Sequence, residues 1–337
     1  MELFEKVHLQ VTVESPRAIG TSRSLADRVF RGVSRGGGVA VLVIMSSVGV
    51  FLLARAWQAL SVSGISFFTV VEWDPDGGAG RFGIAAVLVG TILIALVAII
   101  VALPVSLATA LFISEYCPEF LRKALVTLVD LMAAIPSVVF GLWGVFFLQG
   151  TITDVAKWLA TAFGWFPLFA VDGFDPADPL SSITVFTSST FIAGLVVAAM
   201  ITPIMTSIMR EVFSQAPGGE REGALALGST RWGMIRSVVL PYGAGGIIGG
   251  SMLGLGRALG ETIAVYMIIS PVFVIQPHIL QNGTSSVSSL IALRYGEASA
   301  AGMSALMAAG LALFLLTLVV NFVASTIVGR SRSGADN

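Results

Sequence analysis

Two residues of opposite charge, Arg257 and Glu261, lie four residues apart in a stretch that is otherwise uncharged. A guanidinium is a planar cation whose N–H donors match the oxygens of phosphate and related oxyanions. Residues four apart are neighbours on one helix face, so the carboxylate can pair with the guanidinium. Such a partner would weaken the hold on an anion, and transport favours weak, exchangeable binding. The two residues are therefore candidates for an oxyanion path; the alternative is an ion pair that only fixes a helix interface.

The composition of the whole chain indicates what surrounds this pair. Of 337 residues, 55% are hydrophobic and only 12% are charged, with a mean hydropathy of +0.91. A soluble domain carries about 25% charged residues, so soluble, disordered and coiled-coil classes are excluded. The short alternating segments of membrane β-barrels are absent. We predict an all-α fold, a polytopic membrane protein.

Charged residues separate long apolar runs, and a run of about 20 residues is a candidate membrane span. Six runs qualify: about 38–62, between Arg81 and Glu115, from Asp130 to Asp154, between Asp178 and Arg210, one that starts near Val238, and between Glu297 and Arg330. The sequence leaves open whether 266–298 is a re-entrant helix or an external loop.

The positions of lysine and arginine predict the orientation of these spans, because cytoplasmic connections are enriched in both. Of the 19 such residues, 14 lie in 1–37, 115–124, 210–237 and 329–337. Both termini are then expected in the cytoplasm.

This orientation gives the expected domain organisation. Residues 1–37 would form a cytoplasmic N-terminal segment, 38–329 a transmembrane domain with a cytoplasmic loop at 210–241, and 330–337 a cytoplasmic tail.

Arg257 has a membrane depth that can be worked out from this arrangement. Counting from Pro241, a helix that rises 1.5 Å per residue places Arg257 roughly 24 Å along its axis, inside the hydrocarbon. A charge there is costly unless it is paired or faces water. Gly246, Gly250 and Gly254 recur every four residues, a spacing that favours close helix packing.

Residues that catalyse reactions or bind metals elsewhere are scarce. The lysines do not stand in the glycine pattern of a phosphate-cradling loop, so the chain is not expected to bind ATP in that way. His8, His278 and the single Cys117 are too few and too scattered for a metal site. No nucleophile, base and orienting residue can be assembled from neighbouring positions. We predict no catalysis, metal or cofactor on this chain, and no nucleic-acid partner.

The connection 210–241 is the longest charged loop, and its local pattern predicts two short helices. The first would run from Glu220 to Leu227, with acidic residues in its first turn, where the helix dipole favours them. Gly228 follows at a position where helix ends favour glycine. Ser229 or Thr230 would cap the second helix. Ala224, Leu225 and Leu227 form an apolar stripe that could be a docking surface for a cytoplasmic partner. The alternative is a solvated loop that folds against its own helix bundle.

The same connection carries a spaced motif. Glu222-Gly223-Ala224 is followed after three residues by Gly228, and after nine more by Val238-Val239-Leu240-Pro241. This pattern resembles the EAA loop of ATP-binding cassette importer permeases, with departures only at Gly223 and Val238. In that family the short helix docks on the ATPase subunit and transmits its closure. The resemblance implies an ATPase coupling loop that includes these residues: Glu222, Ala224, Gly228, Leu240 and Pro241.

A second resemblance concerns the charged pair. The run 254–265, GLGRALGETIAV, resembles the signature of the PstC permeases of phosphate importers, and 133–144 resembles their third span. The resemblance implies six spans in a bacterial inner (plasma) membrane, with Arg257 and Glu261 as the functional pair. It also implies phosphate as substrate, a PstA-like sister permease, two PstB-like ATPase subunits that hold ATP and Mg²⁺, and a PstS-like phosphate-binding protein.

Three other functions stay open at the level of sequence. The chain could be a permease for another oxyanion, such as sulfate or molybdate. It could be a secondary transporter or channel in which the charged pair is a gate or proton relay. It could also be a membrane scaffold in which the pair is purely structural.

Overall fold

The computed structural model describes residues 25–76, 81–175 and 183–332. Residues 1–24 of the predicted N-terminal segment, the span boundary at Asp178 and the last five residues of the predicted tail lie outside the described residues. The chain divides into two units, residues 1–50 and residues 51–337, which are considered separately. In the first unit the described residues, 25–50, are helical throughout.

The predicted all-α class with six spans is confirmed. Six helical stretches are long and apolar enough to cross a membrane: Leu25–Phe68, Ala85–Tyr116, Ser137–Phe163, Thr190–Ser214, Arg231–Gly260 and Ala300–Thr326. The described residues form no sheet, and their only strand-like pairing is two isolated bridges. Which terminus faces which side of the membrane stays a prediction.

The helices have the following bounds: α1 Leu25–Ser63, α2 Ala85–Leu111, α3 Glu119–Ala133, α4 Ser137–Trp143, α5 Gln149–Phe163, α6 Thr190–Ser214, α7 Gly218–Ala226, α8 Arg231–Met234, α9 Leu240–Gly260, α10 Ile263–Ile268, α11 Val287–Arg294 and α12 Ala300–Arg332. Three short π-helical segments continue helices: Phe112–Tyr116 after α2, Gly144–Leu148 after α4, and Ile235–Val239 between α8 and α9.

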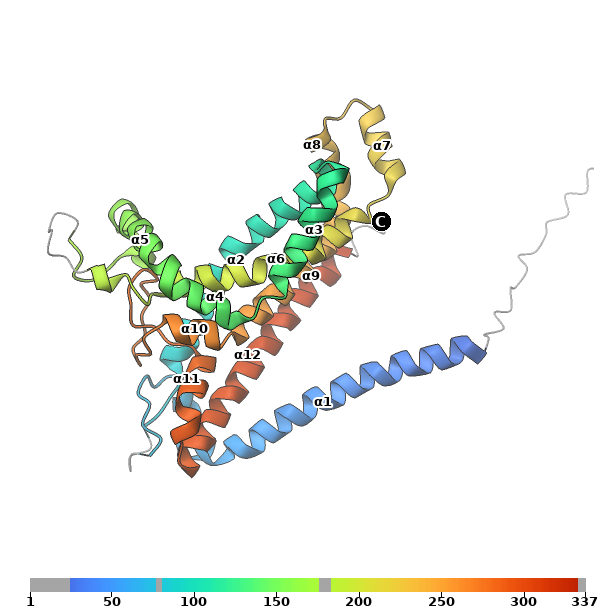
Figure 1. Cartoon of the computed structure of the whole chain (residues 1–337). Coiled ribbons are helices and arrows are strands. Elements are labelled where there is room, and N and C mark those ends of the chain that lie inside the picture. The colour runs from blue at the N-terminus through green and yellow to red at the C-terminus, as the bar shows by residue number, and fades with distance from the viewer. Residues whose placement is uncertain (1–24, 77–80, 176–182, 333–337) are drawn as a thin grey trace, which may run out of the picture. The chain divides into compact units, whose positions relative to one another are not determined.

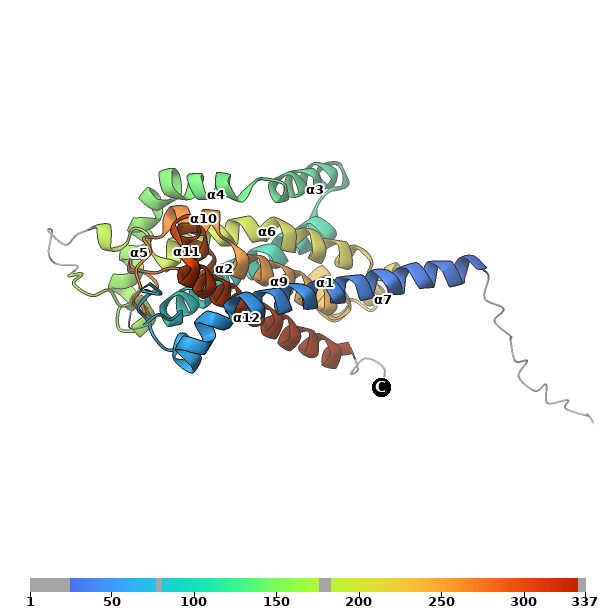
Figure 2. The same cartoon turned by 90° about the horizontal axis from the view of Figure 1, so that it is seen from below.

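Within residues 51–337, α2, α6 and α9 lie alongside one another and form the centre of the bundle (Figures 1 and 2). Their contact faces are apolar, with Ile94, Ile201 and Met205 fully or almost fully buried. One polar contact adds to this packing, because the Ser106 hydroxyl on α2 donates a hydrogen bond of 3.1 Å to the Thr202 carbonyl on α6. In both views α7 lies at one end of this bundle, and α5, α10 and α11 lie at the other; Figure 1 shows α8 at the same end as α7.

The third span differs from its predicted bounds, Asp130 to Asp154. The helix that carries it begins at Ser137 and continues through Asp154 to Phe163. Asp130 belongs to the separate helix α3, which ends at Ala133. The reason is Pro136, which lacks an N–H and disfavours helical backbone in the residue before it. Pro136 therefore separates α3 from α4, and the two do not form one continuous helix.

The sequence left open whether 266–298 is a re-entrant helix or an external loop, and the structure shows both helical and irregular parts. Its first residues, 266–268, are helical as the end of α10, and 269–286 is irregular. The eight-residue α11 and a short 3₁₀ turn then lead to α12. The segment therefore contains two short helices that are joined by an irregular stretch.

The predicted glycine row on α9 faces α6 at close range. A β-carbon added to Gly246 would lie 2.6 Å from Cβ of Val212, and one added to Gly254 would lie 2.5 Å from Sδ of Met205. Gly250 is buried on the same face. Small residues therefore let the two helix backbones approach, as the spacing indicated. Gly249, on the same helix, has open space at its β-carbon position.

We expect Gly246→Ala to destabilise the protein by about 1–3 kcal/mol, because the new methyl group overpacks the α6–α9 interface. The thermal unfolding midpoint of the purified protein in detergent measures this loss. Gly249→Ala is the matched control and should leave the midpoint unchanged or raise it, since alanine favours helix over glycine. Equal midpoints for the two variants would contradict the close packing.

Candidate functional site

The fifth span is broken where the candidate pair lies. Helix α9 ends at Gly260, and Glu261 has an extended backbone with φ −68° and ψ 129°. The next helix, α10, begins at Ile263. Oε1 of Glu261 accepts a hydrogen bond of 3.2 Å from the backbone N–H of Ala264, in the first turn of α10. The carboxylate thus satisfies a backbone donor at the start of a helix, as a capping side chain does.

Two serines of α11 form hydrogen bonds with backbone carbonyls in the break between α9 and α10. The Ser288 hydroxyl donates to the carbonyl of Glu261 at 3.0 Å, and the Ser289 hydroxyl donates to the carbonyl of Thr262 at 3.5 Å. Thr91 on α2 accepts from the backbone N–H of Val287 at 3.0 Å. All these polar side chains are buried. Backbone groups freed by the break are therefore satisfied by side chains, as a membrane interior requires.

Sequence reasoning missed these hydroxyl groups. They belong to a run of six residues, 284–289, that contains five serines and threonines in an otherwise apolar region. Such a run was the available signal, because polar side chains are rare inside a membrane unless they have partners.

Arg257 lies in the last turn of α9, and its side chain is exposed, whereas Glu261 is only 8% exposed. The predicted pairing on one helix face is not present: the described residues contain no ion pair between the two. The physical reason is the break itself, since the four-residue spacing places side chains together only on a continuous helix. The structure brings Arg257 and Glu261 to one helix end, with different surroundings.

This arrangement has a definite chemical capacity. The carbonyl end of α9 carries a partial negative charge, which favours a cation in the last turn. The guanidinium is exposed, so its donors can meet an anion from outside the chain. The buried carboxylate one turn further on is fixed by the hydrogen bond to Ala264. One end of α9 therefore presents an exposed cation whose donors could bind an oxyanion, four residues before a buried acidic group.

The connection between the fourth and fifth spans has the predicted pair of short helices. α7 covers Gly218–Ala226, and Gly228 follows with φ +86°, a left-handed conformation that favours glycine. Thr230, rather than Ser229, caps α8, because its hydroxyl oxygen accepts from the backbone N–H of Gly233 at 3.1 Å. Leu240 and Pro241 begin α9.

α7 has one face on the bundle and one face outside it. Ala224 packs against the main apolar core, so this part of the connection does fold on its own bundle. Glu222 is exposed, and Leu225 and Leu227 are 45% and 90% exposed. Of the other residues predicted for this loop, Gly228 and Pro241 are exposed and Leu240 is half-buried. The outer face of α7 thus offers apolar and acidic side chains for contact.

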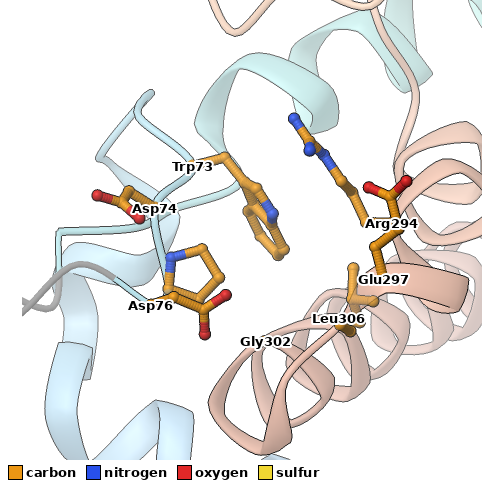
Figure 3. A pocket seen from close by; sticks show the side chains of 9 residues that line it. Trp73, Asp74, Asp76, Arg294, Glu297, Gly302 and Leu306 are labelled. Carbon is orange, nitrogen blue, oxygen red and sulfur yellow. The ribbon is translucent and has the colours of Figure 1, made fainter.

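A separate pocket lies at the far end of the bundle from α7. It has a volume of about 160 Å³, and Figure 3 shows residues that line it. Trp73, Asp74 and Asp76 precede α2, Arg294 is the last residue of α11, Glu297 follows in the 3₁₀ turn, and Gly302 and Leu306 belong to α12. Arg257 and Glu261 do not line it. The pocket and the candidate pair are therefore different places.

Comparison with known proteins identifies the family. Residues 102–333 match the family of binding-protein-dependent transport system inner membrane components. The chain belongs to this family. Similar proteins include the phosphate transport system permease protein PstC 2 of Mycobacterium tuberculosis, 38% identical over 91% of this chain and 93% of its own length. PstC of Xylella fastidiosa is 38% identical over 90% of this chain and 91% of its own. The chain is thus a permease of the PstC type, as its signature run predicted.

A solved structure agrees at the level of the fold. The permease chain of a bacterial ABC transporter involved in the import of the polysaccharide alginate is 18% identical, with a TM-score of 0.53 over 90% of this chain and 99% of that one. The permease described here is accordingly a multi-pass membrane component of a binding-protein-dependent transport system.

We expect Thr230→Ala to destabilise the α8 end of the connection by about 1 kcal/mol, because it removes the capping oxygen. Hydrogen exchange of the amides in 231–234 of the purified permease should become faster. Ser229→Ala, which removes a neighbouring hydroxyl without the cap, should exchange like the unmodified protein. Equal acceleration in both variants would contradict the assignment of the cap to Thr230.

Proposed function

We propose that this permease moves inorganic phosphate inward across a bacterial inner membrane, driven by ATP hydrolysis on separate chains. The observation that carries the proposal is the 38% identity with PstC permeases over nine-tenths of the chain. Those relatives are phosphate transport system permease proteins. The exposed guanidinium of Arg257 supplies the chemistry that an oxyanion needs.

Arg257 and Glu261 form the substrate path in this proposal. Arg257 binds the anion as it passes, and this binding has to be weak so that the anion can leave again. Glu261 keeps a carboxylate near this passage and holds the start of α10 in place. An anion that lingers is disfavoured by that carboxylate, because like charges repel at short range.

In this proposal, conformational changes driven by ATP hydrolysis are transmitted to the substrate path through the outer face of α7. Glu222 and Leu227 are exposed there and suit contact with an ATPase subunit. Two PstB-like subunits would bind ATP and Mg²⁺, so this chain needs no cofactor and catalyses no reaction. A PstA-like sister permease would complete the pathway, and a PstS-like binding protein would deliver phosphate. The proposal includes the orientation predicted from the lysine and arginine positions. The cytoplasm then contains residues 1–37, the connection 210–241 and the tail 330–337.

Arg257→Gln should abolish phosphate uptake, because glutamine removes the charge and the fork of donors while it keeps a similar length. Uptake of labelled phosphate into cells or proteoliposomes measures this, with assembly checked by co-purification of the ATPase. Arg81→Gln, an exposed arginine outside the site, should transport normally. An Arg257→Gln complex that assembles and transports phosphate normally would refute the path assignment.

The same assay separates the competing functions. Excess sulfate or molybdate should not reduce phosphate uptake; strong competition would indicate a permease for another oxyanion. Uptake should also vanish when the ATPase chain is omitted, and uptake that continues without it would indicate a secondary transporter or channel.

Glu222→Lys should uncouple the complex, because it reverses the charge on the exposed face of α7 without disturbing the packed side of that helix. Phosphate uptake should fall strongly, while membrane insertion of the permease stays normal. Glu211→Lys, an exposed charge reversal near the end of α6, is the control and should retain uptake. Full uptake with normal ATPase co-purification in Glu222→Lys would argue against docking through α7.

A further inference from the structure

A partly buried ion pair joins α7 to the end of the second span. Oε1 of Glu115 lies 3.2 Å from Nη2 of Arg221, and the two side chains are 4% and 22% exposed. Glu115 belongs to the π-helical segment Phe112–Tyr116 that continues α2. Arg221 is on α7, directly before the exposed Glu222. The contact therefore links a membrane-spanning helix to the connection proposed to receive the ATPase.

Arg221 also reaches a third element. The same Nη2 atom donates a hydrogen bond to the carbonyl of Phe213, in the last turn of α6. The last carbonyls of a helix have no partner within that helix, so a charged donor is well placed there. One guanidinium thus connects α7, the end of α6 and the end of α2.

A second contact joins the same two regions. Cζ of Arg231, the first residue of α8, lies 5.5 Å from the ring centre of Tyr116, which follows Glu115. An arginine over an aromatic ring is attracted by the electrons of the ring face. Two arginines of the connection therefore hold adjacent residues at the end of the second span.

The hydrogen bonding of the pair indicates a role other than stability. Oε1 of Glu115 and Nε of Arg221 are buried, and among the described residues neither atom has a hydrogen-bond partner. An ion pair with unmet hydrogen bonds recovers little of the cost of burying its charges, so an apolar pair of similar size would serve packing better. What the charged pair provides is a fixed geometry between α7 and α2.

We propose that Arg221 and Glu115 are positioning residues that make α7 and the adjoining end of α2 move as one body. A displacement of α7 is then transmitted to the centre of the bundle through α2, the second span, as well as through α6, the fourth span. The inference rests on the proposed function, since it concerns how ATP hydrolysis is coupled to transport. It assigns that role to two residues outside the EAA-type motif.

The test uses the complete complex of this permease, its sister permease, the ATPase and the binding protein in proteoliposomes. Glu115→Gln keeps the size of the side chain and removes its charge. The measurement is the number of phosphate ions moved per ATP hydrolysed. We expect this ratio to fall about tenfold, because removing one charge of a partly buried ion pair costs on the order of one decade of an equilibrium or more. ATPase subunits should remain bound, and hydrolysis without the binding protein should be unchanged.

Two further arginine variants separate positioning from simple structural support. Arg221→Lys keeps the charge and should retain more of the coupling ratio than Arg221→Gln. The double variant Glu115→Gln/Arg221→Gln leaves no uncompensated charge, so it should assemble even if a single variant does not. Its ratio should be as low as that of the single variants, since both changes remove one interaction. Glu119→Gln, an exposed carboxylate on α3, is the matched control and should behave like the unmodified complex.

A normal coupling ratio in Glu115→Gln, or in the double variant, would overturn the inference. So would a fall that occurs only together with loss of the ATPase subunits, because that result means failed assembly. The proposed function fails separately: it is refuted if the unmodified complex moves no phosphate at all.

Discussion

A helix that stops inside a membrane leaves backbone groups that lipid cannot satisfy, and the fifth span stops at Gly260. The carboxylate of Glu261 takes up one freed donor at the start of α10, and the hydroxyl groups of Ser288 and Ser289 take up carbonyls on the same turn. Arg257 owes its position to this break, because the last turn of α9 is where a cation is favoured. The hydrogen bonds that satisfy the break therefore also fix the position of Glu261 in the candidate path.

The two candidate functional regions lie at opposite ends of a single element. α9 has 21 residues and so extends about 30 Å, from the connection that contains α7 to the turn that contains Arg257. Its glycine face packs directly on α6, with Gly246 against Val212 and Gly254 against Met205. A helix packed this closely cannot bend independently of its neighbour. Movement of the connection would consequently be felt at the break as a displacement of both helices.

Much of the fold could be predicted because the relevant signals are local. Long uncharged runs gave the six spans, Gly228 marked the end of α7, and the four-residue glycine spacing indicated the contact between α9 and α6. The substrate-path and coupling roles of the named residues stay predictions. The pairing of Arg257 with Glu261 was not found, because periodicity presumes an unbroken helix and cannot show that Glu261 will bond to its own backbone. The contact of Glu115 with Arg221 joins positions 106 residues apart, and no spacing rule reaches that far.

The π-helical segment Ile235–Val239 lies directly before α9 and fixes the rotational phase of everything that follows it. A π-turn holds one residue more than the α-helix would use, and one residue corresponds to about 100° of rotation about the axis. Regularising that turn to an α-helix would swing the glycine row off α6 and turn the guanidinium of Arg257 towards a different neighbour. The direction in which the guanidinium of Arg257 points is thus set by one additional residue in the turn before α9, far from Arg257 along the helix.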